Sequence, residues 1–206
     1  MKKINILGVG AALVDQQFSV EDSLLKDLQL NKGSMDLKDQ ETQDQTYKKL
    51  THLYGSSKDA CGGSSTNTVY AASILGSKCS FIGKVADDVN GNFYVDNLNK
   101  AKIKNKCMSS DQGVSGNCLV MVSPDAERTM STFLGISSEL KISDLDEDMI
   151  KEAETVYLEA YLVSSDQCFT TTKRIIEIAQ KNNCLLYTSD AADDSLRVDL
   201  GGRRII

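Results

Sequence analysis

The chain has 206 residues, of which 41% are hydrophobic and 25% are charged. These fractions are typical of a globular protein with one hydrophobic core, and they exclude the disordered and fibrous classes. The formal net charge of -6 argues against a nucleic-acid partner, because nucleic-acid-binding proteins usually present a basic face. No apolar stretch is long enough to span a bilayer, so we expect no membrane partner.

The six cysteines and the single histidine limit the chemistry that the chain can carry. No two cysteines stand at the spacing of a zinc or redox motif, and a chain of this length does not need disulfide bonds. We therefore expect reduced thiols in a reducing compartment, which favours a cytoplasmic location. His52 is the single histidine and gives little basis for a histidine-based metal site or a catalytic triad. We expect it on the surface of a helix.

The N-terminal segment has two interpretations. Lys2 and Lys3, followed by the apolar run 4–14, imitate a secretory signal peptide. The same run also fits a short buried strand that ends in the glycine turn Gly8-Val9-Gly10. We favour the strand because no clean small-residue cleavage site precedes a new polar N-terminus.

The stretch 15–58 is polar and irregular, and we expect it to form a lid or an inserted subdomain. Leu24, Leu25 and Leu28 indicate a short amphipathic helix within it, and 32–37 an extended piece. From Ser64 onward the pattern is clearer.

A helix is predicted over 66–75, and Gly76 is well placed to end it in a left-handed cap. Its apolar stripe consists of Tyr70, Ala71, Ile74 and Leu75. The run 79–85 predicts a buried strand. Asp88 can cap a second helix that runs to about Lys100. The apolar face of this second helix consists of Phe93, Tyr94 and Leu98.

The later part of the chain continues this alternation. Two extended runs, 117–123 and 128–134, are joined by a turn-forming sequence and predict a β-hairpin. The remaining predicted elements are a helix that starts at Ser143 and Asp146 and runs to Glu154, a strand over 156–163 and a helix over 168–181. This order predicts an α/β fold with a mostly parallel sheet.

Residues 186–206 differ from the rest because they show neither helical nor strand periodicity where an α/β chain needs its next core strand. They are similar to translated sequencing-adapter sequence at the ends of metagenomic reads. We therefore interpret 1–185 as part of one native domain and 186–206 as a non-native tail. A flexible native tail is the alternative.

The segment Gly62-Gly63-Ser64-Ser65-Thr66-Asn67, at the head of a predicted helix, is the most informative part of the chain. Glycines let backbone amides approach a ligand, and the free amides of a helix start can donate hydrogen bonds to ligand oxygens. The segment therefore fits a hydroxyl-binding site, and it fits a plain glycine turn with a Ser or Thr cap equally well.

Asp15 follows the first strand and its turn, so we expect it at the carboxyl edge of the sheet, where ligands bind in open α/β folds. A carboxylate there suits a pair of sugar hydroxyls, although an aspartate after a strand is more often a turn or cap residue. The turn Gly8-Val9-Gly10 does not complete a dinucleotide fingerprint, because Leu13 stands at the third glycine position. A nicotinamide oxidoreductase is therefore disfavoured.

Three spaced motifs run through the first half of the chain. They are Gly8-x-Gly10-x4-Asp15, Cys61-Gly62-Gly63-x3-Asn67-x8-Gly76 and Phe81-Ile82-Gly83-Lys84-Val85-Ala86-Asp87-Asp88-x2-Gly91. Their order and spacing resemble the ribokinase-like (PfkB-type) carbohydrate kinases. The runs 32–35, 125–130 and 157–161 resemble bacterial adenosine kinase-like members most, and the resemblance covers about residues 3–185.

The resemblance implies a ribokinase-like, Rossmann-type central sheet with flanking helices and a small β lid, truncated before the ATP-binding half. The lid segments are expected at about 13–55 and 105–135. The residues implied to bind substrate hydroxyls are Asp15, Gly62, Gly63 and Asn67, the two glycines through their backbone.

The roles of two further residues are left open. Arg128 resembles an arginine that faces the transferred phosphate, and an exposed turn cation is the equal alternative. Glu159 would reach the substrate only if its side chain points to the correct face of its strand. Ala11, Ala86 and Ala160 depart from residues usual in the family, and the first of these leaves the exact substrate open.

The resemblance further implies that the intact protein transfers the γ-phosphoryl group of ATP to a hydroxymethyl group of a sugar or nucleoside, with adenosine favoured. The family's Asn-x-x-Glu motif and its Gly-Ala-Gly-Asp anion hole with the catalytic aspartate are not found in the sequence. We therefore expect no catalytic or metal-binding residue here, ATP and Mg²⁺ bound mainly by a missing C-terminal part, and an inactive fragment. A homodimer through the lid is a further hypothesis, and a non-catalytic sugar- or nucleoside-binding module is the alternative function.

Overall fold

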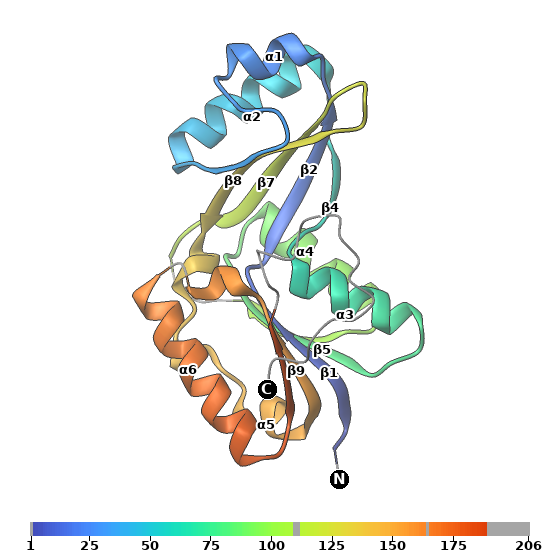
Figure 1. The fold of residues 1–206 in the computed structure, drawn as a ribbon, viewed down its shortest axis with the longest axis vertical. Helices are drawn as coiled ribbons and strands as arrows, with labels where there is room; N and C mark the ends of the chain where they lie inside the picture. The colour runs from blue at the N-terminus through green and yellow to red at the C-terminus, as the bar shows by residue number, and fades with distance from the viewer. Residues whose placement is uncertain (1, 109–111, 164, 189–206) are drawn as a thin grey trace, which may run out of the picture.

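The computed structural model describes residues 2–108, 112–163 and 165–188. Its strands form two five-stranded sheets that follow one another along the long axis of the molecule (Figure 1). The central sheet has the strand order β10-β9-β1-β5-β6, and the lid sheet has the order β3-β8-β7-β2-β4. The chain passes from the central sheet into the lid directly, between the first two strands.

All pairings in the central sheet are parallel, as the sequence predicts. Its strands are β1 (Ile4–Val9), β5 (Cys79–Val85), β6 (Lys104–Met108), β9 (Ala153–Leu158) and β10 (Leu185–Thr188). Every residue of β5 is buried, including Ser80 and Lys84, as expected for a strand that is covered on both faces.

Helices cover both faces of the central sheet (Figure 1). The four are α3 (Ser64–Ile74), α4 (Val89–Lys100), α5 (Glu147–Glu152) and α6 (Asp166–Lys181). α3 and α4 pack on one face, and α5 and α6 pack on the other. This arrangement confirms the predicted fold class of a parallel α/β sheet with flanking helices.

Local signals in the sequence mark several helix ends correctly. The Asp88 side chain accepts a hydrogen bond from the Gly91 amide at 2.8 Å and caps α4. Gly76 follows α3 with φ +93°, a conformation that favours glycine. The predicted stripe on α3 is wrong as a buried face, because Ile74 is 71% exposed and Leu75 is 86% exposed. α3 instead buries a face that includes Val69.

The lid sheet contains the predicted β-hairpin and is covered on one face by two helices (Figure 1). Its strands are β2 (Leu13–Ser19), β3 (Met35–Leu37), β4 (Lys58–Cys61), β7 (Ser115–Val122) and β8 (Arg128–Gly135), and its helices are α1 (Asp22–Asp27) and α2 (Gln40–Tyr54). The predicted lid segment 13–55 lies in this part. The segment 105–135 begins in β6 of the central sheet, so only its part from β7 onward belongs to the lid.

Three lid elements, β2, α2 and β4, were not predicted. α2 buries Gln43 and Thr46 beside Leu50, so its inner face lacks the apolar stripe that identifies an amphipathic helix. β4 is an edge strand whose first three residues are exposed, and it therefore shows no alternation of apolar and polar residues. His52 lies exposed on α2, as expected.

The predicted boundaries after residue 135 need correction. Asp146, not Ser143, caps α5, and its side chain accepts hydrogen bonds from two backbone amides. The predicted strand over 156–163 begins at Ala153 and ends at Leu158, where the 3-10 helix η3 (Ala160–Val163) follows after one residue. Two other 3-10 helices, η1 (Ile136–Glu139) and η2 (Ile142–Asp144), precede α5.

The chain remains regular slightly beyond the expected end of the domain. β10 pairs with β9 as far as Thr188, three residues past the predicted boundary at 185. The rest of the predicted tail, 189–206, lies outside the described residues. In the described ranges, no helix has the length and apolar character to cross a membrane, and all six cysteines are free.

Candidate functional site

The glycines at the carboxyl end of β1 lie so close to their neighbours that a side chain would not fit there. A Cβ atom on Gly8 would lie 2.6 Å from Ser65 Oγ, and a Cβ atom on Gly10 would lie 2.5 Å from Glu159 Oε2. Non-bonded heavy atoms do not approach this closely, so the two positions require glycine. The glycines of the first motif thus allow α3 and the end of β9 to converge on one point.

Asp15 reaches this point from the lid. It is the third residue of β2 and lies in register with Ala60 of β4 and Cys118 of β7. The expectation that it stands at the carboxyl edge of the central sheet is therefore wrong in detail. Its side chain packs directly on the glycine turn instead, because a Cβ atom on Gly62 would lie 2.1 Å from Asp15 Oδ1.

The Gly62-Gly63 turn offers one of its two amides to a ligand. The Gly62 amide donates to the Leu13 carbonyl at 2.8 Å, so it is already engaged. Among the described residues, the Gly63 amide has no hydrogen bond. Gly63 has φ +93°, and a Cβ atom there would lie 2.7 Å from the Ala11 carbonyl oxygen. Asn67, one turn into α3, is exposed.

Glu159 is the residue of this site whose orientation the sequence left open. It follows β9, its amide donates to the Val9 carbonyl at 3.0 Å, and its side chain is 3% exposed. Its Oε2 accepts a hydrogen bond from the Ser65 amide at 3.2 Å. The signal that identifies it is position, because it stands where the carboxyl ends of two parallel strands meet.

Burial changes the acidity of both carboxyl groups. It raises the pKa of Glu159 to about 7, and the negative charge of Asp15 adds to this, while the hydrogen bond from the Ser65 amide acts in the opposite direction. Burial also raises the pKa of Asp15, and the positive charge of Arg128 opposes that rise. Glu159 therefore differs from an exposed carboxylate in the pH range near neutrality.

Arg128 lies at the start of β8 and is exposed. Asp15 of β2 lies opposite Cys118 of β7, and Cys118 lies opposite Thr132 of β8. Arg128 precedes Thr132 on β8 by an even number of residues. Because side chains alternate along a strand, Arg128 projects from the same face of the lid sheet as Asp15. This shared face explains how the guanidinium charge acts on the Asp15 carboxylate.

The cysteines near Asp15 are not nucleophiles. Burial, with a smaller contribution from the Asp15 charge, raises the pKa of Cys61 to about 12. Burial likewise raises the pKa of Cys118 to about 11, against a hydrogen bond from the Thr132 hydroxyl. Both thiols therefore stay protonated at neutral pH.

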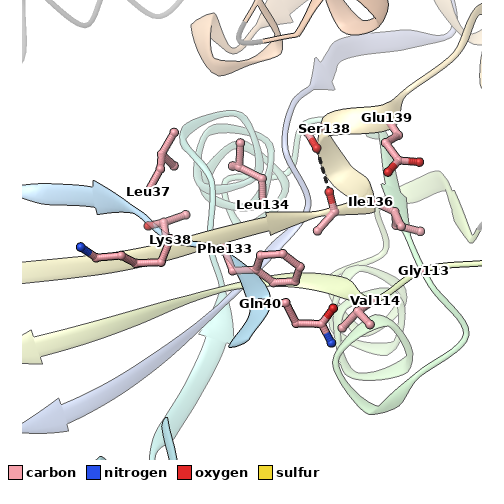
Figure 2. A pocket seen from close by; sticks show the side chains of 12 residues that line it. Leu37, Lys38, Gln40, Gly113, Val114, Phe133, Leu134, Ile136, Ser138 and Glu139 are labelled. Atoms are coloured by element: carbon pink, nitrogen blue, oxygen red, sulfur yellow. Dashed lines mark hydrogen bonds between the residues drawn. The ribbon is translucent and has the colours of Figure 1, made fainter. Parts of the chain in front are cut away.

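A cavity of about 380 Å³ opens at the end of β8, where β3 has already ended (Figure 2). Its apolar lining includes Leu37, Leu134 and Ile136, and polar groups of Gln40 and Glu139 lie at its margin. Thr132 also lines it and is two strands away from Asp15 across the sheet. Neighbouring strands are about 4.8 Å apart, so the cavity begins about 10 Å from Asp15.

The described residues contain no group of three or more His, Cys, Asp or Glu side chains that could hold a metal ion. What the residues of this site offer is a carboxylate, a free amide and an amide side chain around one point, with a guanidinium on the same lid face. Such a set can bind and orient a small molecule that carries several hydroxyl groups.

Known proteins match this chain along most of its length. The family model described as pfkB family carbohydrate kinase matches residues 33–200. A probable sugar kinase protein from Rhizobium etli CFN 42 is 27% identical, with a TM-score of 0.84, over 91% of this chain and 56% of its own. The adenosine kinase from Sinorhizobium meliloti is 26% identical, with a TM-score of 0.83, over 90% of this chain and 56% of its own.

Among curated sequences, the probable fructokinase-7 of Arabidopsis thaliana is 29% identical over 69% of this chain and 41% of its own length. The chain thus spans about two fifths of that relative and just over half of the two solved structures.

Proposed function

The chain belongs to the pfkB family of carbohydrate kinases, and we propose that the intact protein transfers the γ-phosphoryl group of ATP to a hydroxymethyl group of a sugar or nucleoside. Within this proposal the 206-residue chain carries the acceptor-binding half. Adenosine is the favoured acceptor. Sugar kinases and an adenosine kinase are both among the similar proteins, which supports the general reaction type in intact relatives.

The observation that carries the proposal is the contact between Asp15 and the glycine turn. Two neighbouring hydroxyl groups can both donate to one carboxylate, and the Gly63 amide and the Asn67 side chain can bind their oxygens. The turn must be glycine for the carboxylate to come this close. Asp15, Gly62, Gly63 and Asn67 are therefore proposed as the hydroxyl-binding set, with Gly62 serving through its shape because its amide is engaged.

The cavity beside β8 supports a nucleoside over a free sugar. It begins about 10 Å from Asp15, which is comparable to the distance between the ribose hydroxyls and the far side of a base. Leu37, Leu134 and Ile136 provide an apolar lining, and a planar base with few charges suits such a surface. A free sugar would leave this cavity without a use.

Arg128 is proposed to face the transferring phosphoryl group. A guanidinium is most effective where negative charge spreads over several oxygens, as it does in the transition state of phosphoryl transfer. Its shared face with Asp15 supports this role, since the acceptor hydroxyl and the phosphoryl group must meet in one place.

ATP and Mg²⁺ are proposed to bind mainly to the part of the relatives that this chain does not cover. When bound, Mg²⁺ neutralises charge on the phosphates, and no step proposed for this chain's own residues depends on it. The general base would also come from that part, so we propose that residues 1–206 bind the acceptor without turning over ATP. The free cysteines support a cytoplasmic location, and a homodimer through the lid stays a prediction.

The test is calorimetric titration of residues 1–206 with adenosine and with fructose, together with an ATP-turnover assay. We expect adenosine to bind more tightly than fructose, and we expect no turnover. Turnover by these residues alone would contradict the proposed division of labour, and a lack of binding to either compound would contradict the acceptor site. Binding by an intact protein that never phosphorylates its ligand would favour the non-catalytic binding module.

A further inference from the structure

The Gly62-Gly63 turn has more conformational freedom than most loop segments, because neither residue has a side chain to restrict it. A residue on α4, Tyr94, contacts it. Tyr94 is fully buried, and its hydroxyl group forms a hydrogen bond with Thr66 Oγ1 and lies 3.4 Å from the Gly62 carbonyl oxygen. One partner is thus in the turn itself, and the other lies in the first turn of α3.

The chemistry of the three groups sets the direction of these hydrogen bonds. A carbonyl oxygen can only accept, so the Tyr94 hydroxyl donates to Gly62 and must accept from the Thr66 hydroxyl. Each hydroxyl group donates once, and each finds one acceptor. The result is an ordered chain from Thr66 through Tyr94 to Gly62 in a buried site, where unpaired polar groups are costly.

We infer that Tyr94 is a positioning residue of the acceptor site, which holds the Gly62-Gly63 turn against Asp15 through its hydroxyl group. The inference rests on the proposed function for the role of the turn, but the contact itself does not. The aromatic ring packs near Phe81, with a centroid distance of 6.0 Å, and phenylalanine would fill the same space. The hydroxyl group makes the hydrogen bonds to Gly62 and Thr66, so its removal separates positioning from packing.

The decisive variant is Tyr94→Phe in residues 1–206, compared with wild type by hydrogen–deuterium exchange and by adenosine titration. We expect amide exchange over 62–67 to become about tenfold faster and adenosine affinity to fall about tenfold, because a buried hydrogen-bond network is lost. Exchange over β5 should not change. Tyr70→Phe is the matched control, because it removes a hydroxyl group from a part-exposed tyrosine of α3, and it should change neither quantity.

Leu98→Ala provides the contrast for a purely structural role. Leu98 is also fully buried on α4, so its truncation should weaken the whole domain and raise exchange in all segments together. If Tyr94→Phe raised exchange everywhere in the same way, or left 62–67 unchanged, the inference would be wrong. Thr66→Val removes the other hydroxyl group of the chain and should reproduce the local effect, so it decides the question if Tyr94→Phe does not fold.

The two proposals can fail separately. If wild-type protein binds neither adenosine nor a sugar, the proposed function fails, and the exchange data on ligand-free protein still decide the role of Tyr94. If adenosine binds with equal affinity to wild type and Tyr94→Phe, the turn is not positioned for the acceptor by this hydroxyl group, and the inference is wrong while the proposed function stands.

Discussion

The central sheet and the lid sheet are held together by different chemistry. Every residue of β5 is buried between two apolar clusters. In the lid, α2 adds buried polar groups to a smaller apolar cluster. Gln43 donates to Asn117 Oδ1 at 3.0 Å and to the Ser131 carbonyl at 2.9 Å, and it accepts from the Ser131 hydroxyl at 2.8 Å. The central sheet is therefore packed mainly by apolar contacts, with Lys84 of β5 as a buried exception that pairs with Asp144 at 3.0 Å, whereas the smaller lid cluster is supplemented by directional bonds.

The comparison also explains where the candidate site lies. Asp15 comes from the lid, while the glycine turn and Glu159 adjoin the central sheet, so the site forms where the two parts meet. Substitutions within one sheet should change stability, whereas substitutions at the boundary should change binding.

The largest effect is expected from a cavity in the central sheet. Leu7→Ala, at a fully buried position of β1, should lower the free energy of unfolding by about 4 kcal/mol, because both transfer and cavity contributions are lost. Urea denaturation measures it. Leu185→Ala on β10, where leucine is 61% exposed, is the control and should have little effect. Equal effects at both positions would show that β1 is not in a well-packed core.

Asp15→Ala tests the junction of the two parts. In the intact protein it should lower kcat/KM by an amount equal to about 3 kcal/mol, because a partly buried charged hydrogen-bond acceptor is lost, while the fold survives. Steady-state kinetics with adenosine and sugars measure it. Asp59→Ala, on the neighbouring strand β4 and exposed, should leave kcat/KM unchanged. Near-normal kcat/KM in Asp15→Ala across all acceptors would contradict the hydroxyl-binding role.

Glu159 should make stability depend on pH. Its pKa rises from 4.5 in the unfolded chain to about 7 in the folded protein, so the folded state binds more protons between these values. The stability contribution is therefore present at low pH and is lost as the pH rises from about 5 to 7, by about 3 kcal/mol.

Urea unfolding of wild type and Glu159→Gln, between pH 5 and pH 8, measures this effect. The variant cannot ionise at position 159, so its stability should fall less steeply with pH. Parallel pH profiles of the two proteins would mean that Glu159 does not titrate in this range.

The smallest effect is expected from the polar part of the lid. Gln43→Leu introduces an apolar side chain of similar size and removes the hydrogen bonds to Asn117 on β7 and Ser131 on β8, so it should cost about 2 kcal/mol. Gln45→Leu, exposed on the same helix, is the matched control. A neutral or stabilising Gln43→Leu in urea denaturation would mean that the lid is held by apolar burial like the central sheet.

Much of the fold could be predicted from local signals. The apolar residues of β5, the Asp88 cap of α4 and the turn of the β7–β8 hairpin each give a signal within a few residues. The glycine turn before α3 was identified for the same reason. These features need no information from distant parts of the chain.

Other features depend on contacts between residues far apart in the sequence. The polar residue Gln43 on the inner face of α2 has its partners on β7 and β8, 74 and 88 residues away. A local pattern cannot reveal such partners, and periodicity alone shows no helix there. α3 was predicted correctly as a helix, but its buried face was not, because only the close approach of β1 decides which side packs inward.

The sequence by itself predicted the glycine turn and the helix start, because these signals lie within a few residues, while Asp15 joined the candidate site only through the resemblance to a family. Only the tertiary structure decided that Asp15 reaches the turn from the lid, that Glu159 points inward beside Ser65, and that the Tyr94 hydroxyl group lies 3.4 Å from the Gly62 carbonyl oxygen. The physical reason is that side-chain direction and hydrogen-bond partners are set by strand register and helix packing. Those quantities exist only once the two sheets have formed.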